Sequence, residues 1–140
     1  MVVLTEHIKI STKGNSDVVD ITDDVAGVLR KSKLNSGNAT IFVVGSTAAI
    51  TTTEFEPGLK KDIPEMLDRI APGSGSYHHN ETWADGNGHA HIRASFLGPS
   101  LVVPFEGKML LLGTWQQIVL IDCDTRPRLR EIIVQLMGIE

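Results

Sequence analysis

The sequence predicts an α+β fold, with a mostly antiparallel β-sheet and two helices in one compact domain. Two segments carry apolar side chains at helical spacing, and about seven others are apolar or alternating runs of strand length. The last of these runs follow one another without an intervening helical segment, which is typical of α+β proteins. No linker or repeat divides the 140 residues, so residues 1–140 are expected to form a single domain.

The first half of the chain mixes strand and helix signals. Residues 3–11 are rich in β-branched side chains and predict an opening strand. Thr22 or Asp23 is expected to cap a helix over residues 24–33, and Gly37 lies beyond its end. Further elements are expected as strands at residues 40–44 and 48–53 and as a helix at residues 59–70.

The second half predicts a loop followed by consecutive strands. Residues 71–76 are rich in Gly, Pro and Ser, and the polar segment 77–88 is expected to be mostly loop as well. Strands are expected at residues 89–96, 100–105, 109–112, 115–121 and 129–137. The sequence Glu106-Gly107-Lys108 would join two of them as a hairpin.

Composition excludes several classes of function. Thirteen basic and 17 acidic residues give a net charge of −4, which argues against non-specific nucleic-acid binding. No apolar run is long enough to cross a membrane, and the N-terminus does not resemble a secretory signal. Cys123 is the only cysteine, so no intrachain disulfide can form, and a reducing, cytoplasmic location is expected.

Four histidines lie within fourteen residues, and this segment is the most promising site: His78, His79, His89 and His91. If residues 89–93 form a strand, His89 and His91 point to one face, and the turn at residues 85–88 could bring the other two back towards them. Two or three imidazoles plus an oxygen ligand suit zinc or a similar ion. The alternative is that these histidines belong to a solvated loop and a strand edge.

Three other segments have both a functional and an ordinary interpretation. Trp115 beside two glutamines either lines a pocket or is a core tryptophan after a hairpin turn. The aspartates and arginines of residues 122–130 either bind a phosphate or pair on the surface. Ser46 could be a nucleophile, but the Gly-x-Ser-x-Gly elbow of serine hydrolases is absent.

Five sequence blocks occur in order along the chain: STAAITTTE (46–54), YHHN (77–80), HIRA (91–94), SFLGPSLVVP (95–104) and GTWQ (113–116). Together they resemble the YjbQ-like family, also described as secondary thiamine-phosphate synthases. The resemblance extends over residues 41–138 and supports the α+β fold. It implies a homotrimer and a weak thiamine-phosphate synthase activity, which joins a pyrimidine diphosphate to a thiazole phosphate.

The resemblance also implies roles for particular residues. The family's motif positions fall on Glu54, His79, Asn80, His91, Trp115 and Gln116, with Asp122 and Arg128 as weaker matches. The implied catalytic residues are His79, His91 and Glu54. The implied substrate-binding residues are Asn80, Trp115, Gln116 and Arg128. The histidine cluster, rather than the resemblance, predicts that a divalent metal, zinc or magnesium, is held by His79, His91 and His89.

One departure from the family pattern concerns Gly45, where many members carry a histidine. If that histidine contributes to the site in other members, this chain either lacks the group or replaces it with His78 or His89. The leading hypothesis is an enzyme that acts on a phosphorylated metabolite. The alternatives are a non-catalytic homotrimer that binds a metal or metabolite, and a purely structural trimer.

Overall fold

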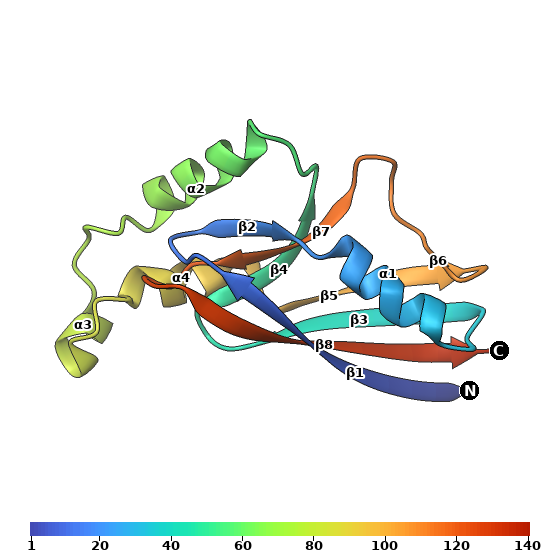
Figure 1. Cartoon of the computed structure of the whole chain (residues 1–140). Coiled ribbons are helices and arrows are strands. Elements are labelled where there is room, and N and C mark those ends of the chain that lie inside the picture. The colour runs from blue at the N-terminus through green and yellow to red at the C-terminus, as the bar shows by residue number, and fades with distance from the viewer.

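Two antiparallel sheets and four helices make up the computed structural model, which describes residues 1–140 (Figure 1). The strands are β1 (Val2–Thr12), β2 (Asp17–Asp20), β3 (Ser36–Val44), β4 (Ala48–Thr53), β5 (Ser100–Glu106), β6 (Met109–Leu110), β7 (Gln117–Asp122) and β8 (Arg128–Ile139). The helices are α1 (Thr22–Lys31), α2 (Leu59–Ile70), α3 (His78–Trp83) and α4 (Gly88–Leu97). The prediction of an α+β fold with mostly antiparallel strands is confirmed.

The larger sheet has five strands in the order β1-β8-β3-β5-β6. The strand β8, which lies between β1 and β3, alternates between buried and more exposed residues, so that Ile132, Val134 and Leu136 point into the main core. The opposite face of β8 carries Met137 and Ile139, which are about half exposed. One face of this sheet is therefore packed against the rest of the protein, while the other is open and partly apolar.

The smaller sheet, in the order β2-β7-β4, is buried on both faces. Along β7, Ile118 and Leu120 belong to the main core, which α1 and the larger sheet complete. The residues between them, Val119 and Ile121, belong to a second core with Leu67 of α2 and residues of α4. The continuous apolar run of β7 follows from this position, because a strand covered on both faces has no solvent side. In Figure 1, α1 and α2 lie on different sides of this strand.

The prediction of two helices is wrong, because α3 and α4 occupy residues expected to be loop and strand. The alternating polar and apolar residues of segment 89–96 imitate a strand pattern. Its buried residues instead repeat at helical spacing, with Ala90 and Ala94 one turn apart. Small side chains at these two positions let α4 pack closely on the smaller sheet, and this tertiary contact is not visible in the local sequence.

The boundaries of the two predicted helices lie within two residues of those in the structure. α2 matches the expected range of residues 59–70, whereas α1 begins two residues before the expected start. The side chain of Asp20, rather than that of Thr22 or Asp23, accepts a hydrogen bond from the free backbone N–H of Thr22 at 2.9 Å. None of the four helices has the length and apolar character that crossing a membrane requires.

Candidate functional site

A buried ion pair links the end of β7 to the beginning of β8. Asp122 is fully buried and accepts hydrogen bonds from Arg130 Nε at 2.7 Å and Nη2 at 2.8 Å. The hydroxyl of Thr12, at the end of β1, donates to the same carboxylate at 2.6 Å. Burial by itself raises the pKa of Asp122, but the bonds from Arg130, Thr12 and the Asp124 backbone outweigh it and lower the pKa. Asp122 is therefore a carboxylate with a structural role.

A second aspartate extends this cluster towards the surface. Asp124 accepts hydrogen bonds from Thr47 Oγ1 at 2.9 Å and from Arg128 Nη2 at 2.6 Å. Burial opposes ionisation, yet the Thr125 backbone N–H, Thr47 and Arg128 together lower the pKa of Asp124 to about 2. The prediction offered phosphate binding or surface pairing for these residues. The structure shows pairing, but in a largely buried cluster.

Two histidines from neighbouring helices face each other. The rings of His79 in α3 and His91 in α4 have centroids 4.4 Å apart and are tilted by 56°. With its amide turned so that the nitrogen faces these groups, Asn87 donates to His79 Nε2 at 3.0 Å and to Asp85 at 2.9 Å. In this arrangement the proton of neutral His79 lies on Nδ1. Two imidazoles at this distance can share a proton or a ligand.

The loop between α3 and α4 fixes this pair. Asn80 Oδ1 accepts a hydrogen bond from the backbone N–H of Gly88 at 2.9 Å, which joins α3 to the first residue of α4. A Cβ atom at Gly88 would lie 2.5 Å from Cβ of Tyr77, so this close approach requires glycine. Asn80, which the resemblance suggested as a substrate ligand, thus has a structural role in the free protein.

His89 does not join the histidine pair. Because α4 is a helix, positions 89 and 91 point in different directions, and the expectation that they share a strand face is wrong. His89 is 7% exposed, and its Nδ1 has no hydrogen-bond partner. Burial, followed by the charge of Arg93, lowers the pKa of His89, so its ring is neutral at pH 7. His78 points into solvent, with its Nδ1 3.6 Å from Glu81.

The remaining predicted site residues lie at the other end of the smaller sheet. The pairing of β4 with β7 places Ala48 opposite Asp122 at one end and Thr53 opposite Gln117 at the other. Five residue steps along a strand span roughly 17 Å. Glu54, Trp115 and Gln116 follow or precede the far ends of these strands.

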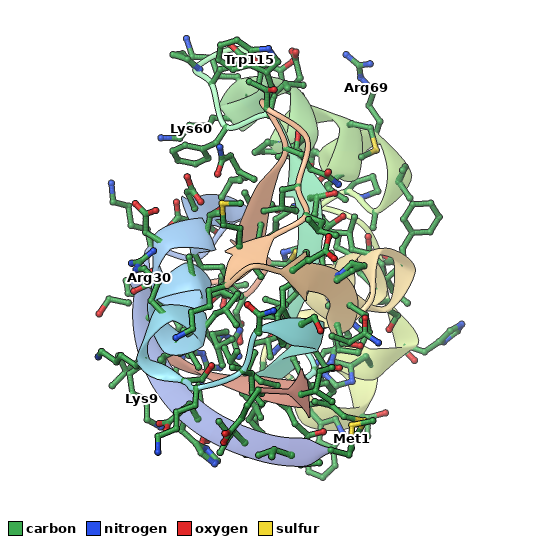
Figure 2. All side chains as sticks on the ribbon, turned by 90° about the vertical axis from the view of Figure 1, so that its right-hand side faces the viewer. Met1, Lys9, Arg30, Lys60, Arg69 and Trp115 are labelled. Atoms are coloured by element: carbon green, nitrogen blue, oxygen red, sulfur yellow. The ribbon has the colours of Figure 1, made fainter.

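Figure 1 shows this separation, with α3 and α4 on one side of the molecule and the loop between β6 and β7 on the other. In Figure 2, Trp115 lies at one extremity of the molecule. Trp115 is 71% exposed, so it is not a core tryptophan. Gln116 donates from Nε2 to Thr52 Oγ1 at 3.1 Å and accepts from the Gly113 backbone N–H at 3.0 Å. One chain therefore gathers the histidine pair and the Asp–Arg cluster on one side and Glu54, Trp115 and Gln116 on the other.

The chain alone offers a limited set of metal ligands. No group of three or more His, Cys, Asp or Glu side chains is arranged to hold a metal ion. His79 and His91 supply two imidazoles, and Asp85 Oδ1 lies 3.4 Å from His79 Nε2. Cys123 is not available, because burial raises the pKa of its thiol to about 11.

Sequence reasoning missed three residues that shape the site: Asp85, Asn87 and Thr47. The first two lie in the turn between the histidines, and their side chains orient His79. Thr47 joins the Asp–Arg cluster, where its Oγ1 accepts a hydrogen bond from Arg130 Nη2 at 2.7 Å. Arg130 was among the predicted arginines of residues 122–130, and the sequence did not show that it is buried.

These features define a class of protein: an α+β domain of two antiparallel sheets, with a histidine pair and a buried Asp–Arg cluster near the same edge. Comparison with known proteins then shows the family. The model of the UPF0047 YjbQ-like family matches residues 6–139, and the chain belongs to this family.

Relatives and solved structures agree with this assignment. A UPF0047 protein of Methanothermobacter thermautotrophicus is 38% identical over 138 residues, covering 99% of this chain and 94% of its own length. The Bacillus subtilis UPF0047 protein YugU is 34% identical over 136 residues, covering 96% of this chain and 100% of its own. A Sulfolobus solfataricus structure, described as a YbjQ-like protein of unknown function, is 40% identical with a TM-score of 0.92 and covers 97% of both chains.

The lowered pKa of Asp124 predicts how stability responds to acid. Because the pKa is about 2 in the folded state and about 3.9 in the unfolded state, the carboxylate stabilises the fold above about pH 4. This contribution, about 2 kcal/mol, is lost as the pH falls towards 2. Asp124→Asn should therefore lower stability at pH 7 and flatten its decline between pH 4 and 2, measured by urea unfolding.

The control is Asp23→Asn, which removes an exposed carboxylate that has no side-chain partner. It should leave both the stability at pH 7 and the acid response close to those of the unmodified protein. If Asp124→Asn and the unmodified protein lose the same free energy between pH 4 and 2, the contacts with Thr47 and Arg128 do not hold this carboxylate ionised.

Proposed function

We propose that this protein is an enzyme that acts on a phosphorylated small molecule at the His79–His91 pair. The main observation in support is that two helices hold the centroids of these rings 4.4 Å apart, while Asn87 and Asp85 orient one of the rings. Imidazole exchanges protons near neutral pH, and a pair fixed in this way can hold a proton on one ring and accept one on the other.

The surrounding residues support a phosphorylated substrate. Arg128 is half-buried and uses Nε and Nη2 on Asp124, at 3.1 and 2.6 Å, which fixes the direction of its guanidinium. Its remaining nitrogen, Nη1, donates to no protein atom and is available to a phosphate oxygen. A guanidinium held in place by a carboxylate loses little freedom when it binds an anion.

A divalent metal is the second part of the proposal. His79 and His91 would hold it, with water or substrate oxygens in the remaining positions, because this chain does not supply a third ligand. Zinc suits imidazole ligands better than magnesium, which prefers oxygen. When bound, the ion would supply neutralisation of charge on a phosphoryl group. His89 could join as a ligand only after leaving its buried position.

The specific reaction proposed is that of thiamine-phosphate synthase. Pyrophosphate leaves the pyrimidine diphosphate, and the thiazole nitrogen forms the new C–N bond at the same carbon. Arg128 would bind the departing pyrophosphate, and a histidine of the pair would donate a proton to it. The second candidate is a non-catalytic binder of the same ligands. It is favoured by the absence of a strong general base near the histidine pair.

A homotrimer is also proposed, and two observations support it. The outer face of the larger sheet exposes large apolar residues, among them Phe42, Val102 and Met137. Such a face is typical of surfaces that associate. In addition, Glu54 and Trp115 are far from the histidine pair within one chain, so only a second copy could bring them to it.

The histidine pair can be tested with the double variant His79→Ala, His91→Ala. The unmodified protein should bind near-stoichiometric zinc or another divalent ion and release pyrophosphate from the two thiamine precursors. The double variant should lose both properties, with a decrease in rate of at least about 100-fold, because it removes the proton-transferring groups. Elemental analysis and a pyrophosphate assay measure the two effects.

A matched control is His78→Ala, which removes an exposed histidine from the same helix. It should retain metal content and rate. Metal binding and ligand-induced stabilisation without turnover would support the non-catalytic binder instead. The metal proposal fails if the unmodified protein remains metal-free after dialysis against divalent ions.

The trimer predicts a solution mass of three times the 15.2 kDa chain by light scattering. Phe42→Glu places a charge on the open sheet face and should yield monomers, because a buried unpaired charge costs several kcal/mol. Ile70→Glu, at an exposed isoleucine of α2, should remain trimeric. A monomeric unmodified protein would refute the trimer.

A further inference from the structure

Arg130 is a largely buried arginine, and one nitrogen of its guanidinium has no hydrogen-bond partner in the protein. Its side chain is 9% exposed, and Nε and Nη2 are used on Asp122 and Thr47. The third nitrogen, Nη1, donates to no protein atom. Nη1 is not among the buried atoms that lack a partner, so it is accessible from solvent. The contacts with Asp122 and Thr47 fix the guanidinium, and an acceptor that approaches from solvent can therefore reach Nη1 in a defined direction.

Gly45 borders this nitrogen directly. A Cβ atom at Gly45 would lie 2.8 Å from Arg130 Nη1, so any other residue would occupy the space in front of it. Gly45 follows the last residue of β3, and its φ is 147°. The glycine thus leaves Nη1 open at the loop between β3 and β4.

The same loop provides further donors. The backbone N–H groups of Gly45, Ser46 and Thr47 donate to no backbone or side-chain acceptor of the protein. Arg128 lies two residues before Arg130 on β8, hence on the same face and about 7 Å away. Its Nη1 is also free. Arg128 therefore offers a second free guanidinium donor on the same face of β8 as Arg130.

The charge of this region suits an anion. Between residues 122 and 130, three arginines face two aspartates, which leaves one net positive charge in a chain of net charge −4. Both aspartates are already occupied by arginine and threonine donors. The carboxylate of Glu131, whose residue lies opposite Val44 in the sheet, is engaged by His7 and Lys9. An anion at Gly45 would therefore meet free donors, while the neighbouring carboxylates already have partners.

We infer that Gly45, Ser46 and the free Nη1 of Arg130 form a subsite for a tetrahedral phosphoryl group. A phosphate offers several strong acceptor oxygens, which matches an arginine donor combined with backbone N–H groups. A carboxylate has only two oxygens and would leave more of these donors unmet. This inference rests on the proposed function for its substrate, since it identifies where the phosphoryl group binds, but the subsite can be measured without turnover.

The direct test is a titration of the unmodified protein with inorganic phosphate, followed by amide NMR. The backbone signals of Gly45 and Ser46 should shift in a saturable way, and those of Gly107, at the distant hairpin, should not. Phenyl phosphate should compete for the same signals, and acetate at equal concentration should bind at least about tenfold more weakly, having fewer charge-assisted bonds. Absent shifts at Gly45 and Ser46, or saturable shifts only at His91, would overturn the subsite.

The variant Gly45→Ala tests the space in front of Arg130. It should weaken phosphate binding about tenfold or more, because its methyl group displaces the anion from Nη1. The matched control is Gly107→Ala, since Gly107 also has a positive φ of 58° but nothing within 4 Å of an added Cβ. A φ of 58° costs alanine less than a φ of 147° does, so Gly107→Ala controls for a positive-φ substitution that adds no contact, and it should bind phosphate normally. The NMR titration of the unmodified protein remains decisive if Gly45→Ala does not fold.

The outcomes separate the subsite from the proposed enzyme. Phosphate binding that Gly45→Ala abolishes, in a protein that does not convert the thiamine precursors, supports the subsite and refutes the synthase. Conversion of the precursors, combined with unchanged phosphate affinity in Gly45→Ala, supports the enzyme and refutes the subsite.

Discussion

The pairing of Arg130 with Asp122 is the interaction on which the arrangement of this protein depends. It joins β8 of the larger sheet to β7 of the smaller one, while Thr12 and Thr47 bring in the ends of β1 and the β3–β4 loop. The rest of the space between the sheets is filled by apolar side chains, which pack without a fixed direction. The ion pair has fixed geometry, and it therefore sets how the strand ends meet.

The functional features lie where this pairing positions them. The same guanidinium that holds Asp122 presents a free nitrogen at Gly45, and Asp124 orients Arg128 beside it. α4 packs on the smaller sheet close enough for the charge of Asp124 to act on His89. One end of the smaller sheet thus combines fixed positive charge with the nearby histidine helices. This combination supports the proposal that a phosphorylated substrate binds at this end, beside groups that can donate a proton to a departing pyrophosphate.

Much of the fold could be predicted from the sequence, because most strands here bury at least one face and show it as apolar or alternating runs. Segment 89–96 could not, since its strand-like alternation arises from two small alanines at helical spacing and from polar residues between them. At the site, the histidine-rich segment was predicted from the sequence, and His79 and His91 of that segment do pair. His89, which was expected to join them, does not. Thr47 and Asn87 were missed, because the partner of Thr47 is distant in sequence and Asn87 lies in a turn whose sequence shows no sign of a role.

The most direct test of the central role of Arg130 and Asp122 is a double-mutant cycle with Asp122→Asn and Arg130→Met, followed by urea unfolding. Each single change leaves a buried group without its partner and should cost about 3–5 kcal/mol. The double variant leaves no uncompensated charge and should cost clearly less than the sum of the two. Additive losses would contradict the account, because they would mean that the two side chains stabilise the fold independently of each other.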